Sequence, residues 1–192
     1  MPTIAAMPDL KDRPARERIL LAADDLFYRE GIRATGIDRV IAEAGVAKLT
    51  FYRHFPSKND LVLVFLEHRH ACWMAWFNAA LVRHRPSSGN ALAALVPTIA
   101  EWLHDEQFRG CAFLNAVGEL GGTLPEVVAI CRRHKREMTA TIAKLLPASR
   151  QRMRQASAIA IAVDGAIAHA QFEPDTKASL KALDDLLRPF LV

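Results

Sequence analysis

The chain is poor in the features that mark disulfide-rich and metal-binding proteins. It has three cysteines in 192 residues, Cys72, Cys111 and Cys131, and no C-x-x-C pair. Because these thiols are far apart and odd in number, neither a disulfide framework nor a zinc site is indicated, and a reducing cytoplasm is the expected compartment. A chain of this length can bury a core without metal or disulfide help, so we expect no cofactor and no metal.

Long apolar runs are also missing. Residues 1–13 contain no apolar run long enough for a signal peptide, and their prolines predict a flexible arm. The longest weakly apolar stretch, 156–170, contains Asp164 and His169 and is too short to cross a bilayer. The expected protein is soluble and has no membrane partner.

Signals for β-strands are nearly absent. No N-G or D-G turn lies between alternating runs, and alanine and leucine dominate. The sequence predicts an all-α fold with an N-terminal three-helix bundle at 14–60 and a larger C-terminal helical domain at 61–192. Helices are expected at about 14–30, 35–44, 47–54, 57–85, 91–105, 112–120, 125–146, 150–171 and 176–191.

Glycine and proline separate the first helices. Gly31 is expected to end the first helix, and Thr35 is a plausible N-cap of the second. Gly45 breaks the chain before a short third helix, which is the helix-turn-helix pattern. Ser57, with Asp60 three residues later, predicts a capping box at the start of the fourth helix.

The stretch 45–58 has no acidic residue. It carries Lys48, Arg53 and Lys58, while Phe51 and Phe55 are spaced to face a core. A short helix with one apolar and one cationic face can enter a DNA major groove, although an ordinary solvated helix would also carry such cations.

The segments I-L-L-A-A-D-D-L-F-Y-R-E-G and I-D-R-V-I-A-E-A-G-V-A-K-L-T-F-Y-R-H-F-P-S-K-N-D-L carry a family likeness. Residues 18–61, about a quarter of the chain, resemble the DNA-binding domain of the TetR family of transcriptional repressors. The remainder is similar only in helical architecture, in length and in C-A-F-L-N at 111–115. The resemblance implies a non-enzymatic regulator that binds double-stranded DNA at a palindromic operator, is a homodimer and is released by a small-molecule effector.

The resemblance also assigns DNA contacts. Lys48 and Thr50 lie near the end of the third helix that approaches bases, and Lys48 can meet a guanine or a phosphate. Arg53 can reach either a base or a phosphate. Lys58 lies in the first turn of the fourth helix, where backbone N–H groups also favour a phosphate. The predicted DNA-binding residues are Thr35, Lys48, Thr50, Tyr52, Arg53, His54 and Lys58.

The third helix departs from the family at one position. Many members have glycine where this chain has Leu49. This side chain either touches a thymine methyl group or packs against its own domain.

The family places a ligand pocket in the C-terminal domain, beside the fourth helix. Aromatic side chains line such pockets but also fill ordinary cores, and polar residues in apolar stretches are candidates for orienting a ligand. A buried Glu119 would need a partner or a proton. The predicted ligand-binding residues are Trp73, Trp76, Phe77, Trp102, His104, Phe113, Asn115, Glu119 and His169.

The last two expected helices can supply the dimer interface. Small residues in 156–170 permit close helix approach, and 180–191 carries a leucine-rich stripe, so together they resemble half of a four-helix bundle. Both stripes can instead close the monomer core.

Other interpretations stay open at this stage. His68 and Cys72 share a helical face as two metal ligands would, and the basic run at 132–136 is either a second nucleic-acid patch or a solvated surface. Rival functions are an enzyme, for which no catalytic constellation is visible, a DNA-binding protein without an effector, and an activator.

Overall fold

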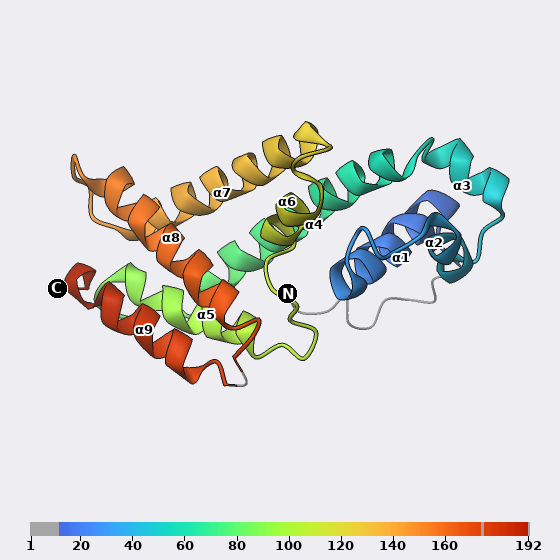
Figure 1. Cartoon of the computed structure of the whole chain (residues 1–192). Helices are drawn as coiled ribbons and strands as arrows, with labels where there is room; N and C mark the ends of the chain where they lie inside the picture. Colours follow the sequence, from blue (N-terminus) through green and yellow to red (C-terminus); the bar gives the residue numbers. More distant parts are fainter. Residues whose placement is uncertain (1–11, 174, 192) are drawn as a thin grey trace. The chain divides into compact units, whose positions relative to one another are not determined.

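The computed structural model describes residues 12–173 and 175–191 (Figure 1). All regular elements in this part of the chain are helical, which confirms the all-α prediction. The predicted arm, 1–13, lies mostly outside the described residues. The elements are α1 (Ala15–Glu30), α2 (Ile37–Ala44), α3 (Lys48–His54), α4 (Lys58–Arg83), η2 (Ala91–Ala94), α5 (Leu95–Leu103), α6 (Ala112–Leu120), α7 (Pro125–Leu145), α8 (Arg152–His169), α9 (Lys177–Leu187) and η3 (Arg188–Phe190).

The chain divides into two compact units. Of the described residues, one unit contains 12–71 and 112–131, and the other contains 72–111, 132–173 and 175–191. The divisions fall inside α4 and inside α7, so each of these helices contributes to both units. The predicted division into 14–60 and 61–192 stays a prediction about functional domains.

The first unit is built on a three-helix core. α1 packs against α2 and α3, and α2 also packs against α3. Leu26, Val40, Phe51 and Leu61 are almost fully buried there, one from each of the first four helices. Because their side chains remove apolar surface from water, they fix the three short helices that would be unstable alone.

The helix boundaries of this core follow local chemistry. Gly45 adopts φ +60 and ψ +43, a left-handed conformation that allows the sharp turn between α2 and α3. The Ser57 hydroxyl accepts from the backbone N–H of Asp60 at 3.1 Å and donates to its carboxylate at 2.6 Å. Ser57 therefore caps α4 as predicted, while the Asp60 carboxylate bonds to the Ser57 hydroxyl instead of the backbone N–H that a capping box uses.

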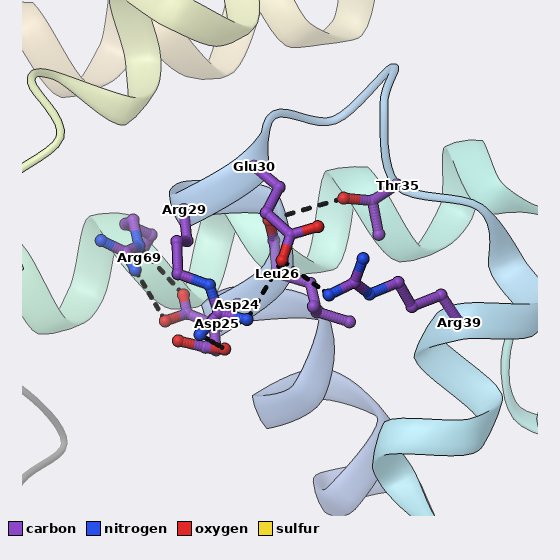
Figure 2. Close-up of polar contacts among 8 residues, drawn as sticks. All are labelled: Asp24, Asp25, Leu26, Arg29, Glu30, Thr35, Arg39 and Arg69. Atoms are coloured by element: carbon purple, nitrogen blue, oxygen red, sulfur yellow. Dashed lines mark hydrogen bonds and ion pairs between the residues drawn. The ribbon is translucent and has the colours of Figure 1, made fainter.

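Thr35 does not cap α2, so that prediction is wrong. Gly36 occupies the N-cap position and offers no side chain to the helix. The Thr35 side chain is completely buried, and its hydroxyl donates to the carbonyl of Gly31 at 2.8 Å. It also donates, more weakly, to the carbonyl of Leu26 at 3.5 Å (Figure 2). Thr35 therefore fastens the α1–α2 connection.

The second unit is formed mainly by α5, α8 and α9. α9 lies against both α8 and α5 (Figure 1). Ile99, Ile159, Val163 and Leu183 are buried in this packing. No helix among residues 12–173 and 175–191 is long and apolar enough to cross a membrane.

Candidate functional site

The surface of α3 is divided into an apolar and a cationic face. Phe51, and Phe55 just after the helix, are almost completely buried, with their ring centroids 6.1 Å apart. Lys48, Tyr52 and Arg53 are exposed. The amphipathic arrangement predicted for 45–58 is therefore present, and its cations face solvent.

Leu49 is 73% exposed at the start of α3. The alternative that it packs against its own unit is therefore wrong.

Lys48 has a carboxylate neighbour, Asp38, that was not predicted from the sequence. Its Nζ lies 3.1 Å from Oδ1 of Asp38, in the first turn of α2, and both side chains are largely exposed. The hydrogen bond to Asp38 raises the pKa of Lys48. Spacing along the chain does not reveal this pair, because the α2–α3 turn brings the two helices together.

The remaining predicted DNA contacts have different surroundings. Thr50, His54 and Lys58 are half-buried. Burial lowers the pKa of Lys58, and the charge of Glu119 partly opposes that effect. The assignment of Thr35 to DNA contact is wrong for its side chain, because the hydroxyl is buried and already used inside the protein.

A buried ion pair fastens α1 to α4 within the same unit (Figure 2). Arg69 donates to both carboxylate oxygens of Asp24, at 3.0 and 2.7 Å, and its guanidinium carbon lies 3.9 Å from the ring centroid of Tyr28. Both charged side chains are more than 90% buried. Local sequence pattern does not predict this pair, because its members are 45 residues apart.

Glu119 is engaged with the backbone of the same unit. Its two oxygens accept hydrogen bonds from the N–H groups of Ile32, at 3.1 Å, and Arg33, at 2.6 Å. The partner expected for a buried Glu119 is thus the turn after α1. The carboxylate therefore joins α6 to that turn, and its role in orienting a ligand stays a prediction.

Four of the predicted ligand-binding residues come together in the second unit. Trp73 stacks on Phe77 with centroids 4.6 Å apart and meets Trp102 edge-on at 5.6 Å, while Trp76 lies 6.1 Å from Trp102. Phe108 joins Trp102 at 5.6 Å. We call these five residues the tryptophan cluster.

The other predicted ligand residues lie outside that cluster. His104 and His169 are exposed, and His169 contacts Phe172 with ring centroids 5.0 Å apart. Phe113 and Asn115 belong to α6 in the first unit, where Phe113 is buried and its carbonyl accepts from the thiol of Cys131. A role for them in binding stays a prediction.

The outward surface of α8 and α9 carries two apolar stripes with a spacing of four residues. The α8 stripe includes Met153, Ile161 and Gly165, and the α9 stripe consists of Ala178, Ala182 and Leu186; all six are exposed. A cavity of about 360 Å³ lies between the helices and is lined partly by Gly165, Ala182 and Leu186. By contrast, Leu183 and Leu187 of the predicted leucine stripe are buried within the unit.

The described residues offer no group of three or more histidine, cysteine, aspartate or glutamate side chains able to hold a metal ion. His68 and Cys72 each take part in other interactions. The described residues thus offer a cationic surface on α3, the tryptophan cluster in the second unit and an exposed apolar surface on α8 and α9.

Comparisons with known proteins identify the family of the N-terminal region. Residues 19–64 match the family model of bacterial regulatory proteins, tetR family. The chain is 30% identical over 158 residues to the HTH-type transcriptional activator FasR of Mycolicibacterium smegmatis, covering 79% of this chain and 70% of that protein.

Solved structures agree with this match along nearly the whole chain. SCO4454, a TetR-family transcriptional regulator from Streptomyces coelicolor, has a TM-score of 0.76 and 30% identity, covering 93% of this chain and 96% of its own. The TetR-family regulator sav143 from Streptomyces avermitilis has a TM-score of 0.73 and 25% identity, with coverages of 93% and 98%. The chain belongs to the TetR family and is a DNA-binding helix-turn-helix transcriptional regulator.

Proposed function

We propose that this regulator is a cytoplasmic, non-enzymatic repressor that binds a palindromic operator as a homodimer and leaves it when a small molecule binds. The observation that carries the proposal is the surface of α3. Buried Phe51 and Phe55 anchor the helix, while Lys48, Leu49 and Arg53 stand in solvent. This geometry suits insertion of α3 into a major groove.

Base reading is assigned to the start of α3. Lys48 and Thr50 approach base edges, and the exposed methyl groups of Leu49 meet a thymine methyl group. Asp38 competes with DNA for Lys48, so Lys48 exchanges that carboxylate for an acceptor in the groove when DNA binds.

Backbone contacts fix the register on the duplex. Lys58 follows the Ser57 cap at the start of α4, where free backbone N–H groups add to its charge. Its pKa is lowered by burial, and a phosphate nearby favours the charged form again. Tyr52 and His54 are assigned to phosphates, and Arg53 to a base or a phosphate.

Release by an effector is assigned to the tryptophan cluster. α4 carries Lys58 in one unit and Trp73 and Phe77 in the other, so one continuous helix links the proposed DNA and ligand sites. A ligand that favours one conformation of α4 by about 1.4–2.8 kcal/mol lowers DNA affinity tenfold to a hundredfold.

Substitutions in α3 and at Lys58 test these assignments. Fluorescence anisotropy measures the affinity of each variant for a set of operator sequences. Lys58→Ala should weaken binding to all sequences alike and reduce the slope of log affinity against log salt by about one. Lys48→Ala and Leu49→Ala should instead relax base preference, each at its own position.

Lys144→Ala is the matched control, because Lys144 is exposed in the last turn of α7 and lies in the other unit. It should leave affinity and salt slope unchanged. An unaltered salt slope in Lys58→Ala would remove Lys58 from the phosphate contacts. Uniform weakening of binding to all sequences in Lys48→Ala would show that Lys48 contacts a DNA phosphate and not a base.

An activator is the second candidate, since the relative FasR is described as one. The sign of regulation depends on where the operator lies relative to the promoter. Reporter expression with and without the regulator decides between the two.

A DNA-binding protein without an effector is the third candidate. A thermal-shift screen that finds no ligand able both to stabilise the protein and to release DNA would favour it.

A further inference from the structure

We propose that Trp73, Thr98 and Trp102 bind a planar, uncharged aromatic molecule carrying hydrogen-bond-accepting oxygens. This inference rests on the proposed release by a small molecule and specifies the chemical class of that molecule. It follows from three buried polar groups, from the aromatic rings around them and from the neutral character of the three unpartnered donors.

Two indole N–H groups and one hydroxyl are buried without a hydrogen-bond partner in the described part of the chain. They belong to Trp73 of α4 and to Thr98 and Trp102 of α5. These residues are 3%, 0% and 4% exposed. Because buried polar groups in folded proteins are almost always hydrogen-bonded, three unpartnered groups in one region indicate that an acceptor is supplied from outside.

The third tryptophan provides an internal comparison. Trp76 belongs to the same cluster, and its indole N–H donates to Oε1 of Glu101 at 3.0 Å. The unit thus supplies an acceptor to one indole and leaves the other two unsatisfied. Thr98 and Trp102 are four residues apart and share a face of α5, and the Trp102 ring meets that of Trp73.

The surrounding rings select a flat apolar body. Phe77 stacks on Trp73, with an interplanar angle of 23°, and Phe108 stands edge-on to Trp102 at 86°. Aromatic ligands bind between such faces and edges. Since the rings contact one another, a ligand must separate them, as in a site that opens only in a minor conformation.

Glu101, the carboxylate that bonds to the cluster, does not call for a cationic ligand. Glu101 already accepts from Trp76, from Arg83 at 2.6 Å and from His84 at 2.7 Å. The unpartnered groups are neutral N–H and O–H donors, which are matched by neutral carbonyl or ether oxygens. Burying a charge there without an opposite charge would be unfavourable.

Matched pairs of ligands test the inference on the full-length protein. Each pair is flat and differs by one carbonyl: 9-fluorenone and fluorene, 1-acenaphthenone and acenaphthene, 1-indanone and indane. Titration calorimetry should show at least one ketone binding about tenfold or more tightly than its hydrocarbon partner, as expected when a ligand satisfies a buried donor. The preference should disappear in Trp73→Phe or Trp102→Phe and persist in Val82→Ala, at an exposed position of α4 outside the cluster.

Nuclear magnetic resonance gives a readout that packing alone would not move. The chain has three tryptophans, so a ¹⁵N-labelled sample gives three indole N–H signals, assigned with the phenylalanine variants. The binding ketone should shift the Trp73 or Trp102 signal downfield, while Trp76 stays bonded to Glu101. Equal affinities within every pair, or no binding by any ketone, would overturn the inference.

Operator binding separates this inference from the proposed release mechanism. A hydrocarbon or a cationic dye that releases operator DNA, together with equal affinities within the pairs, would overturn the ligand class and leave the effector mechanism standing. A ketone that binds with the predicted preference but leaves operator affinity unchanged would support the ligand class and count against release through this cluster.

Discussion

At the scale of single residues, Asp24 and Arg69 form a buried ion pair in the first unit. Its two hydrogen bonds and the Tyr28 ring satisfy an arginine that is only 6% exposed. Such a pair adds little over an apolar replacement, but losing one member leaves a buried charge without compensation.

Arg69→Met should therefore lower the free energy of unfolding by about 3–5 kcal/mol, because Asp24 loses its counter-charge. Denaturant unfolding measures the change. The double variant Asp24→Leu, Arg69→Met is the control and should recover most of the loss. A single variant as stable as the parent would show that Asp24 finds another partner.

Local pattern predicted some residues well and others poorly. Phe51 and Phe55 were expected in the core and are buried, because helical spacing decides which face they occupy. Thr35 was expected to cap a helix, but Gly36 intervenes and the hydroxyl turns inward. Asp24–Arg69 and Lys48–Asp38 could not be predicted, since no local rule relates residues that meet only after helices pack.

At the scale of elements, Gly45 decides the angle between α2 and α3. Its left-handed conformation is one that other residues adopt with strain, and an added Cβ would meet only Arg18 at 3.8 Å. Strain and not crowding is therefore the cost of replacing it. Gly118 has the opposite setting, within helix α6 and with open space around an added Cβ.

Gly45→Ala should destabilise the protein by about 1–2 kcal/mol, because alanine adopts the left-handed backbone conformation only with steric strain. Gly118→Ala, the matched control in the same unit, should stabilise it by about 0.5–1 kcal/mol through helix propensity. Thermal unfolding compares them. Equal effects of the two substitutions would mean that the α2–α3 turn relaxes without strain.

Helix positions were predictable because glycine, proline and serine mark their ends. α6 spans the predicted 112–120, and α7 begins at Pro125 as expected. The helix expected at 91–105 begins instead with a turn of 3-10 helix, where the Asn90 side chain accepts from the N–H of Leu92. Such details depend on side-chain hydrogen bonds, which hydrophobic periodicity does not report.

At the scale of the whole molecule, the outer face of α8 and α9 is the surface proposed for dimerisation. The helices were expected to supply it, but the residues named for it include buried ones that close the unit's own core. The exposed members of the two stripes are the better candidates. Sequence pattern could not separate the two sets, because both have spacings of three and four.

Ile161→Asp should shift the protein toward monomer, because it places a charge at the centre of the α8 stripe. Val82→Asp is a close control, since Val82 of α4 is also 73% exposed but lies off the proposed face. Sedimentation velocity measures the molecular mass. Dissociation by Val82→Asp alone would place the interface elsewhere.

The central claim is that α3 reads DNA from two copies related by two-fold symmetry. Selection of bound fragments from a random pool of duplex DNA, followed by sequencing, tests it most directly. The account predicts an inverted repeat whose half-sites lie about 34–36 Å apart, or a multiple of that distance. Enrichment of a single unrepeated site, or no enrichment at all, would contradict it.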